Sequence, residues 1–319
     1  MNEDSWIRNS LAVASAGPNA LFILTTVYPE SDPLNPAGQL LHHMLADEGL
    51  TQSTLSTACP LVAMWRSPGG HLWLGGADGS AWTTASVPWS QDGPAFEAAP
   101  GGSTWTSARL PRLGPSGARP NITAIWGTSD ADVFFATTAG VVYRWNGGGW
   151  SESALGTDAS LTKLAGQSPN HVYAVGYRGT AAHWDGSRWT LLPTPELASA
   201  STIITGVAML ESGDVFASTN RGQLLKRTNA GFTIEVRAEG ACFTGIAAWG
   251  DHVILSSKTG AWIFDGSSLH QLKDNFAATD VQAVDDRLYF IETEQPHGPA
   301  CVEYFAARRS GSPWQRVVF

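Results

Sequence analysis

A unit of about 40 residues recurs along this chain, and it limits the folds open to the sequence more than any other feature. Two copies are plain, at residues 122–155 and 161–192. Each holds a short apolar strand, a Ser/Asp/Asn turn, a second strand, a turn that ends in glycine, and a third strand. Each then closes on W-[ND]-G-x-x-W, at 145–150 and 184–189. A period of roughly 40–50 residues is typical of four-stranded β-propeller blades.

Weaker copies extend the pattern over the whole chain. Residues 11–54 and 61–110 give two stretched units with inserts at about 28–38 and 86–102, and residues 277–319 give a last unit. The sequence therefore predicts an all-β protein with one β-propeller domain over 1–319, built from about seven four-stranded blades. Six or eight blades also fit, because the first 120 residues are irregular. The glycine that closes the turn after the second strand recurs at Gly79, Gly140, Gly179, Gly222 and Gly260.

The composition agrees with such a repeat. The chain of 319 residues has 34 glycines and 14 tryptophans, and 15% of its residues are charged. Low charge excludes a disordered chain or a coiled coil. We expect the tryptophans that end third strands and begin fourth strands to pack between neighbouring blades. We expect the turn glycines to supply the positive φ that tight hairpins need.

The best repeats resemble a known group of propellers. The segments 170–176 (NHVYAVG) and 183–189 (HWDGSRW) are similar to bacterial propellers of the photosystem II assembly factor (Ycf48/Hcf136-like) and BNR/Asp-box type. The resemblance is clear over about 120–195 and implies the fold, not a chemistry. The chain departs from WD40 repeats, which place Gly-His before each blade. It also lacks the arginine cluster of sialidases and a strict S-x-D-x-G-x-x-W box.

Charge and cysteine content narrow the partners and the compartment. The formal charge is −9 and no Lys/Arg-rich run occurs, which disfavours a nucleic-acid or anionic-membrane partner. Cys59, Cys242 and Cys301 are few, odd in number and far apart, so we expect buried free thiols in a reducing compartment. With no signal-peptide pattern and no apolar run of about 18 residues, the sequence predicts a cytoplasmic protein.

No catalytic motif is present. The sequence contains no nucleophile elbow, no phosphate-binding glycine loop and no H-E-x-x-H. We therefore predict a protein that is not an enzyme, with no catalytic residues, no metal and no cofactor. One polar position repeats just before the second strands, where a role in the local turn is favoured over a ring of metal ligands: His71, Asp132, His171, Asp214 and His252.

The turns between second and third strands are the best candidate for a binding site. Three consecutive units place polar residues at matching positions there, and loops on a rigid scaffold are where binding residues concentrate. The insert at 28–38 leaves an equivalent turn, so it should project from the same face. The predicted partner-binding residues are Tyr177, Arg178, Asn220, Arg221 and Lys258.

Three function classes fit a propeller of this kind. The first is a non-enzymatic protein-binding platform: a cytoplasmic assembly factor, or an immunity protein that neutralises a toxin or secreted effector, since acidic inhibitors complement basic effectors. The second is a carbohydrate-binding propeller, although the turn residues differ between units. The third is a glycosidase or lyase with a site in the central channel. We favour the first.

Overall fold

The computed structural model describes most of the chain. The described residues are 6–17, 20–29, 32, 34–46, 49–96, 104–112, 117, 119–194, 197, 200–284, 287–292, 301–305 and 314–318. The inserts expected at 28–38 and 86–102 therefore fall partly outside the described residues. All the named elements are β-strands.

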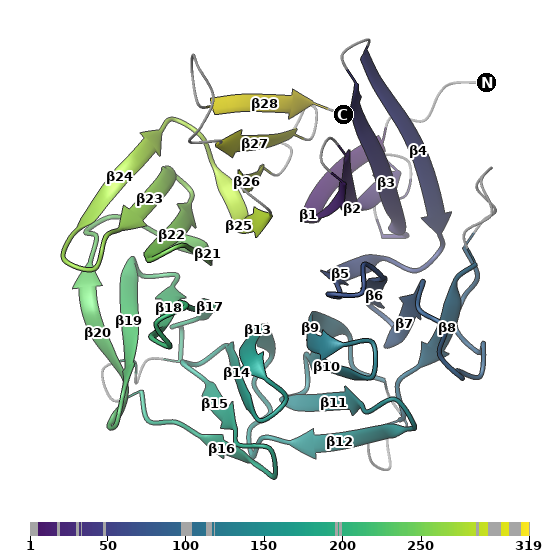
Figure 1. The fold of residues 1–319 in the computed structure, drawn as a ribbon, viewed down its shortest axis with the longest axis horizontal. Helices are drawn as coiled ribbons and strands as arrows, with labels where there is room; N and C mark the ends of the chain where they lie inside the picture. Colours follow the sequence, from purple (N-terminus) through teal and green to yellow (C-terminus); the bar gives the residue numbers. More distant parts are fainter. Residues whose placement is uncertain are drawn as a thin grey trace.

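The strands pair into seven antiparallel four-stranded sheets, arranged as a ring around a central axis (Figure 1). The first two sheets are β1 (Trp6–Gly17), β2 (Ala20–Pro29), β3 (Ala37–Ala46) and β4 (Gly49–Thr57), then β5 (Leu61–Arg66), β6 (Leu72–Gly76), β7 (Ser80–Thr83) and β8 (Thr106–Arg109). The next two are β9 (Ile122–Ser129), β10 (Asp132–Thr137), β11 (Val141–Trp145) and β12 (Trp150–Ala154), then β13 (Leu161–Ser168), β14 (His171–Gly176), β15 (Ala181–Trp184) and β16 (Trp189–Leu191).

The remaining sheets follow the same order around the ring. They are β17 (Ile204–Met209), β18 (Val215–Thr219), β19 (Gln223–Thr228) and β20 (Gly231–Arg237), then β21 (Phe243–Trp249), β22 (His252–Ser257), β23 (Gly260–Phe264) and β24 (Leu269–Asp274), and finally β25 (Ala278–Val284), β26 (Arg287–Glu292), β27 (Cys301–Phe305) and β28 (Trp314–Val318). The prediction of an all-β fold and a single β-propeller is confirmed. Below, each sheet is a blade, numbered in chain order.

The ring closes by packing and not by strand exchange. Each blade consists of four consecutive strands, and the first and last blades are each complete. Between them, the Val13 backbone N–H donates to Gln282 Oε1 at 2.9 Å. Val13, Leu21, Ile23, Leu41, Tyr289 and Ile291 form one buried apolar cluster across this boundary.

A β-bulge recurs in the innermost strand of the blades and connects neighbours. The register of β13 against β14 shifts between Leu161 and Lys163, and equivalent shifts occur in the other blades. In several blades the bulged residue is a threonine. The bulge leaves this residue without a partner on the neighbouring strand, so its hydroxyl can bond to groups outside its own sheet. Thr162 Oγ1 donates to the Ile204 carbonyl at 2.7 Å, and Thr244 Oγ1 donates to the Ala278 carbonyl at 2.7 Å. Each bond joins a blade to the next one.

Tryptophan packs between blades, as the repeat predicts. Phe134 of blade 3 lies 6.3 Å, centroid to centroid, from both Trp184 and Trp189 of blade 4. The insert after β7 also contributes, which the sequence did not indicate. Trp89 is 7% exposed and lies edge-on to Trp73 and Trp145, at 5.4 and 5.8 Å. This part of the insert therefore belongs to the core.

The turn glycines have the backbone conformation that the sequence predicts. Gly79, Gly140, Gly179, Gly222 and Gly260 all have positive φ. At Gly140 (φ 66°) a Cβ would lie 2.0 Å from the backbone oxygen of Thr157. The connection into blade 4 thus passes directly over this turn.

We predict that Gly140→Ala lowers the free energy of unfolding by about 2 to 5 kcal/mol, because left-handed strain adds to a backbone clash. Gly149→Ala is the matched control, since nothing lies within 4 Å of the added Cβ and its φ is not positive. That control should change stability by less than about 0.5 kcal/mol. Urea denaturation measures both, and equal effects of the two substitutions would refute the explanation.

Candidate functional site

The predicted partner-binding residues all lie on one face of the disc. They occupy the turns β14–β15, β18–β19 and β22–β23, which each join a second strand to a third strand. We call the face that carries these turns the turn face. Tyr177, Arg178, Arg221 and Lys258 are exposed, and Asn220 is half-buried.

The turn side chains are anchored to the connections that enter their own blades. Arg178 forms an ion pair with Asp158, and the hydrogen bond from Arg178 holds the pKa of Asp158 below its usual range. Asn220 Nδ2 donates to the Ser201 carbonyl at 3.2 Å, and Arg221 donates to the Ser201 hydroxyl. Arg178 is therefore a positioned guanidinium with a neutralising partner.

Contacts also join the turns of blades 4 and 5 into one surface. Tyr177 forms an antiparallel bridge with Ile203 in the connection between the two blades. The Ile203 backbone N–H donates to Asn220 Oδ1 at 2.9 Å. Tyr177, Arg178, Asn220 and Arg221 thus share a rigid support. Lys258 lies one blade further on, where its backbone N–H donates to the Cys242 carbonyl at 3.4 Å.

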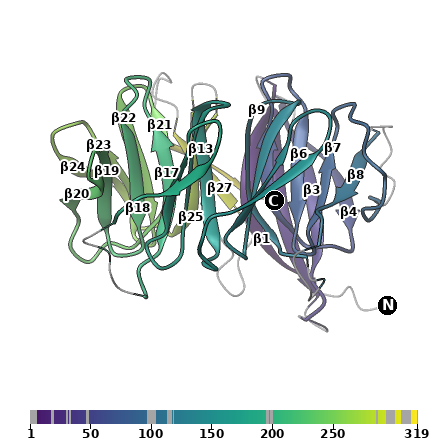
Figure 2. The ribbon, with the colours of Figure 1, turned by 90° about the horizontal axis from the view of Figure 1, so that it is seen from below.

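The first blade extends past the others on this face. Its bulge follows Ser10, which pairs with Thr25, yet β1 begins at Trp6 and β2 continues to Pro29. The four residues beyond Thr25 add about 13 Å at roughly 3.3 Å per residue. Figure 2 shows this end of the purple strands projecting beyond the disc, near the N-terminus. Leu34, in the β2–β3 turn, is 92% exposed.

Three of the polar residues before the second strands contact side chains of their own blades. Asp132 accepts from Thr128 Oγ1 (2.7 Å) and Arg144 Nε (2.6 Å), and Asp214 pairs with Lys226 at 3.2 Å. His171 Nδ1 lies 2.8 Å from His183 Nε2. These contacts agree with the expected structural role. Within the described ranges, no three His, Cys, Asp or Glu side chains are placed to share a metal ion.

One inter-blade contact on these turns is new from the structure. Asp130, which the sequence analysis did not single out, follows β9 and reaches back to blade 2. It lies 2.6 Å from His71 Nδ1 and accepts from Trp73 Nε1 at 2.9 Å. No repeat pattern marks this residue, because its partners lie in another blade.

The cysteines that are described are free, with Cys59 buried and Cys242 half-buried. Burial raises the pKa of the Cys59 thiol to about 12. This thiol is therefore protonated and unreactive at neutral pH. The side chain of Cys301 lies outside the described residues. In the part of the chain that is described, no helix is long and apolar enough to cross a membrane.

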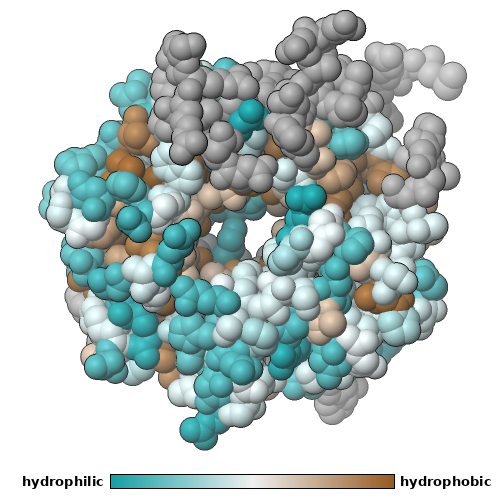
Figure 3. Space-filling model, viewed as in Figure 1, coloured by the Kyte–Doolittle hydropathy of each residue, from teal (hydrophilic) through white to brown (hydrophobic). Residues whose placement is uncertain are grey.

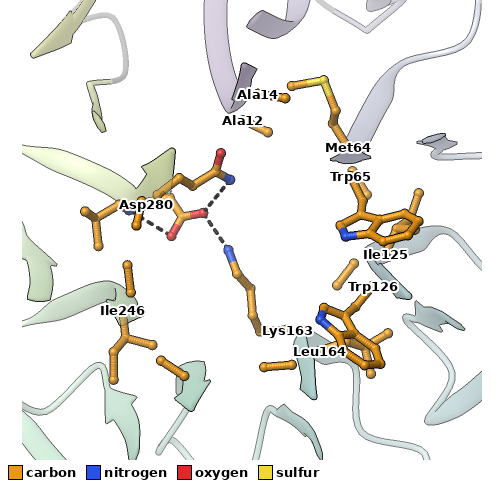
Figure 4. A pocket seen from close by; sticks show the side chains of 18 of the residues that line it. Ala12, Ala14, Met64, Trp65, Ile125, Trp126, Lys163, Leu164, Ile246 and Asp280 are labelled. Carbon is orange, nitrogen blue, oxygen red and sulfur yellow. Dashed lines mark hydrogen bonds and ion pairs between the residues drawn. The ribbon is translucent and has the colours of Figure 1, made fainter. Parts of the chain in front are cut away.

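A channel with a volume of about 810 Å³ runs along the ring axis and is lined by the innermost strand of every blade. Figure 3 shows its opening at the centre of one face, and Figure 4 shows its wall. Trp65 and Trp126 lie on one side. Across the channel, Lys163 of blade 4 reaches Asp280 of blade 7, with Nζ and Oδ2 2.6 Å apart. Asp280 Oδ2 also lies 3.4 Å from Gln282 Nε2.

Lys163 and Asp280 occupy the same position of the repeat. It is the residue directly after the bulge, and the other five blades have alanine or glycine there: Ala12, Ala63, Ala124, Gly206 and Gly245. At Gly206 and Gly245 the next blade is close. A Cβ on Gly245 would lie 2.2 Å from Asp280 Oδ1. The two charged residues are visible in the sequence, but the seven positions can be aligned only once the register of the bulges is known.

No family model matches the chain. The immune protein Tsi7 of Pseudomonas aeruginosa is 28% identical over 123 residues, which is 38% of this chain and 38% of that protein. The match thus covers well under two thirds of the relative.

Solved structures share the fold at low identity. The WD40 propeller domain of Doa1 covers 91% of this chain and 93% of its own, with a TM-score of 0.64 and 11% identity. Ycf48 bound to a D1 peptide covers 92% and 94%, with a TM-score of 0.59 and 14% identity. Sqt1 of Saccharomyces cerevisiae covers 94% and 93%, with a TM-score of 0.57 and 11% identity. At these identities the likeness shows the fold alone. The chain is a β-propeller with a Ycf48 structural neighbour.

We predict that Lys163→Met lowers the free energy of unfolding by about 1 to 3 kcal/mol, because it leaves the Asp280 carboxylate in the channel without its cation. The Lys163→Ala/Asp280→Ala double variant gives both positions the small residues of the other blades. It should return to within about 1 kcal/mol of the wild type. Chemical denaturation measures both, and a double variant less stable than the single one would contradict this account.

Proposed function

We propose that this protein is a non-enzymatic binding platform, and that it acts as a cytoplasmic immunity factor of a bacterium that neutralises a toxin or secreted effector protein. The observation that carries the proposal is the turn face. It presents an exposed tyrosine and two arginines that the scaffold already holds in place. Side chains that are ordered before binding lose less entropy on association, which is what a tight protein interface needs.

The local likeness to an immune protein supports the same reading. Tsi7 shares 28% identity over 123 residues with this chain. The net charge of −9 favours encounter with a basic partner at long range. At the surface itself, Tyr177 and the two arginines offer the amphipathic and hydrogen-bonding groups that dominate protein interfaces.

The backbone at Arg178 adds a second argument. Arg178 has φ of 57° and is followed by Gly179 with φ of 65°. The Thr180 N–H donates to the Tyr177 carbonyl at 3.0 Å, so the turn is of type I′. Asparagine and glycine are the residues that such a position prefers, and an arginine there costs about 1 kcal/mol. A strained, exposed arginine is better explained by binding than by stability.

The proposal is tested by co-expression of the chain with the product of the gene immediately upstream, which we expect to be toxic when expressed alone, followed by affinity measurement on the purified pair. Wild-type protein should restore growth and bind. The Arg178→Glu/Arg221→Glu variant should weaken binding by a factor of about 100 or more, since two anchored donors become repelling charges. Intact thermal unfolding of the variant shows that the fold is retained.

The matched control compares single charge reversals on opposite faces. Arg188 lies in the β15–β16 turn, away from the turn face, and its side chain is 80% exposed. Arg188→Glu should leave binding unchanged while Arg178→Glu weakens it. Equal effects of the two would refute the site. Binding of glycans instead of a protein would favour the carbohydrate-binding alternative, and turnover of a polysaccharide would favour the channel hydrolase or lyase.

A second prediction separates stability from function at the same residue. Arg178→Asn should leave stability unchanged or raise it by up to about 1 kcal/mol, because asparagine adopts the left-handed conformation more readily and exposed ion pairs contribute little. The same change should reduce partner affinity. Denaturation and titration calorimetry measure the two effects, and a clearly destabilised variant would show that Arg178 is held there for the fold.

A further inference from the structure

The ion pair of Lys163 and Asp280 in the channel is not explained by the packing of the blades. Five of the seven blades place alanine or glycine directly after the bulge, so a neutral, small residue suits this position of the fold. Replacing two of them by an ion pair brings a desolvation cost, because the side chains are only 29% (Lys163) and 16% (Asp280) exposed. Ion pairs of this kind are weak contributors to stability compared with small or apolar residues.

The surroundings of the pair have the features of a small-molecule site. A volume of about 810 Å³ lies in the range of roughly 300–1,000 Å³ that ligand pockets occupy. Figure 4 shows Lys163 extending from β13 to Asp280 on β25, with Trp65 and Trp126 on the other side of the open space. The Trp126 ring is fixed against the next blade, since a Cβ on Gly166 would lie 2.6 Å from its Cη2 atom. The wall thus combines rigid indoles with one cation and one anion.

We propose that the channel binds a free α-amino acid with an aromatic side chain, as a zwitterion. Its carboxylate accepts from Lys163 Nζ, its ammonium group donates to Asp280, and its ring packs against Trp65 and Trp126. The inference is independent of the proposed function, because it concerns the channel and not the turn face.

Charge balance selects this class of ligand. Any guest that binds the pair must compete with the Nζ–Oδ2 contact of 2.6 Å. A guest with one charge would satisfy one member and leave the other buried without a partner of opposite charge, which costs more than the new contact returns. A zwitterion replaces both partners at once. The Val13 backbone N–H donates to Gln282 Oε1 and holds this side chain in place, with its Nε2 3.4 Å from Asp280 Oδ2, so Gln282 can keep its contact with Asp280 during the exchange.

The test uses the full chain and three ligands that share the phenyl ring and carbon chain but differ in their charged groups: L-phenylalanine, L-phenylalaninamide and 3-phenylpropanoate. Titration calorimetry and thermal unfolding should show binding of L-phenylalanine at concentrations up to about 10 mM, with a rise in Tm. The amide, which lacks the carboxylate, and the propanoate, which lacks the ammonium group, should bind at least about tenfold more weakly. This series needs no variant and therefore does not depend on folding of a mutant.

A pair of variants then assigns the site. Lys163→Ala/Asp280→Ala gives the channel the residues of the other blades and should weaken L-phenylalanine binding at least about tenfold. Asp214→Ala/Lys226→Ala removes an ion pair outside the channel and should leave binding unchanged. The proposal is overturned if L-phenylalanine, L-tyrosine and L-tryptophan all fail to bind, if the singly charged analogues bind as tightly as L-phenylalanine, or if the channel variant binds like the wild type.

Discussion

The structure depends on the contact between the innermost strands of neighbouring blades. Each blade alone has two apolar faces and strands of only a few residues, which one sheet cannot shield from water. The bulge in the innermost strand turns a threonine hydroxyl toward the next blade, where Thr162 and Thr244 reach carbonyl oxygens at 2.7 Å. At Gly206 and Gly245, the residue after the bulge has no room for a Cβ, because an added Cβ would lie 2.7 Å from the Ile246 side chain and 2.2 Å from Asp280 Oδ1. Ring closure needs no exchanged strand, because the Val13–Gln282 hydrogen bond and a buried apolar cluster join the last blade to the first.

This constraint also decides where function can lie. The strands and their buried faces are committed to the ring, so variation is tolerated in the turns and along the channel axis. On the turn face, the side chains of Arg178, Asn220 and Arg221 contact the connections that enter blades 4 and 5. The ring therefore fixes where the turns lie, and the side chains of the turns supply the groups that can bind a partner. A binding surface built this way changes partner by substitution of a few exposed residues, without altering the core.

The repeat predicted the fold because its signals are local. Turn glycines and the W-[ND]-G-x-x-W segment report backbone conformation within one blade, and Gly140 and Gly179 have the positive φ expected of them. The sequence also predicted that the turns between second and third strands lie on one face, since the order of strands in each blade determines it. What the sequence could not give were contacts between blades. Trp89 lies in a Pro/Gly-rich insert and packs in the core, and Asp130 contacts His71 of the preceding blade. The partner of Arg178 was equally hidden, because Asp158 lies in an irregular connection.

The equivalence of the two channel residues, Lys163 and Asp280, can be recognised only from the strand register at the bulges. Lys163 and Asp280 are 117 residues apart and have nothing in common as a motif. Only after the bulges are aligned do they share a position with five alanines and glycines. At this position Lys163 and Asp280 are therefore the two exceptions among seven blades. The ion pair costs desolvation energy and adds little stability, so we attribute its presence to selection for binding. It lies in the central channel, which all seven blades line.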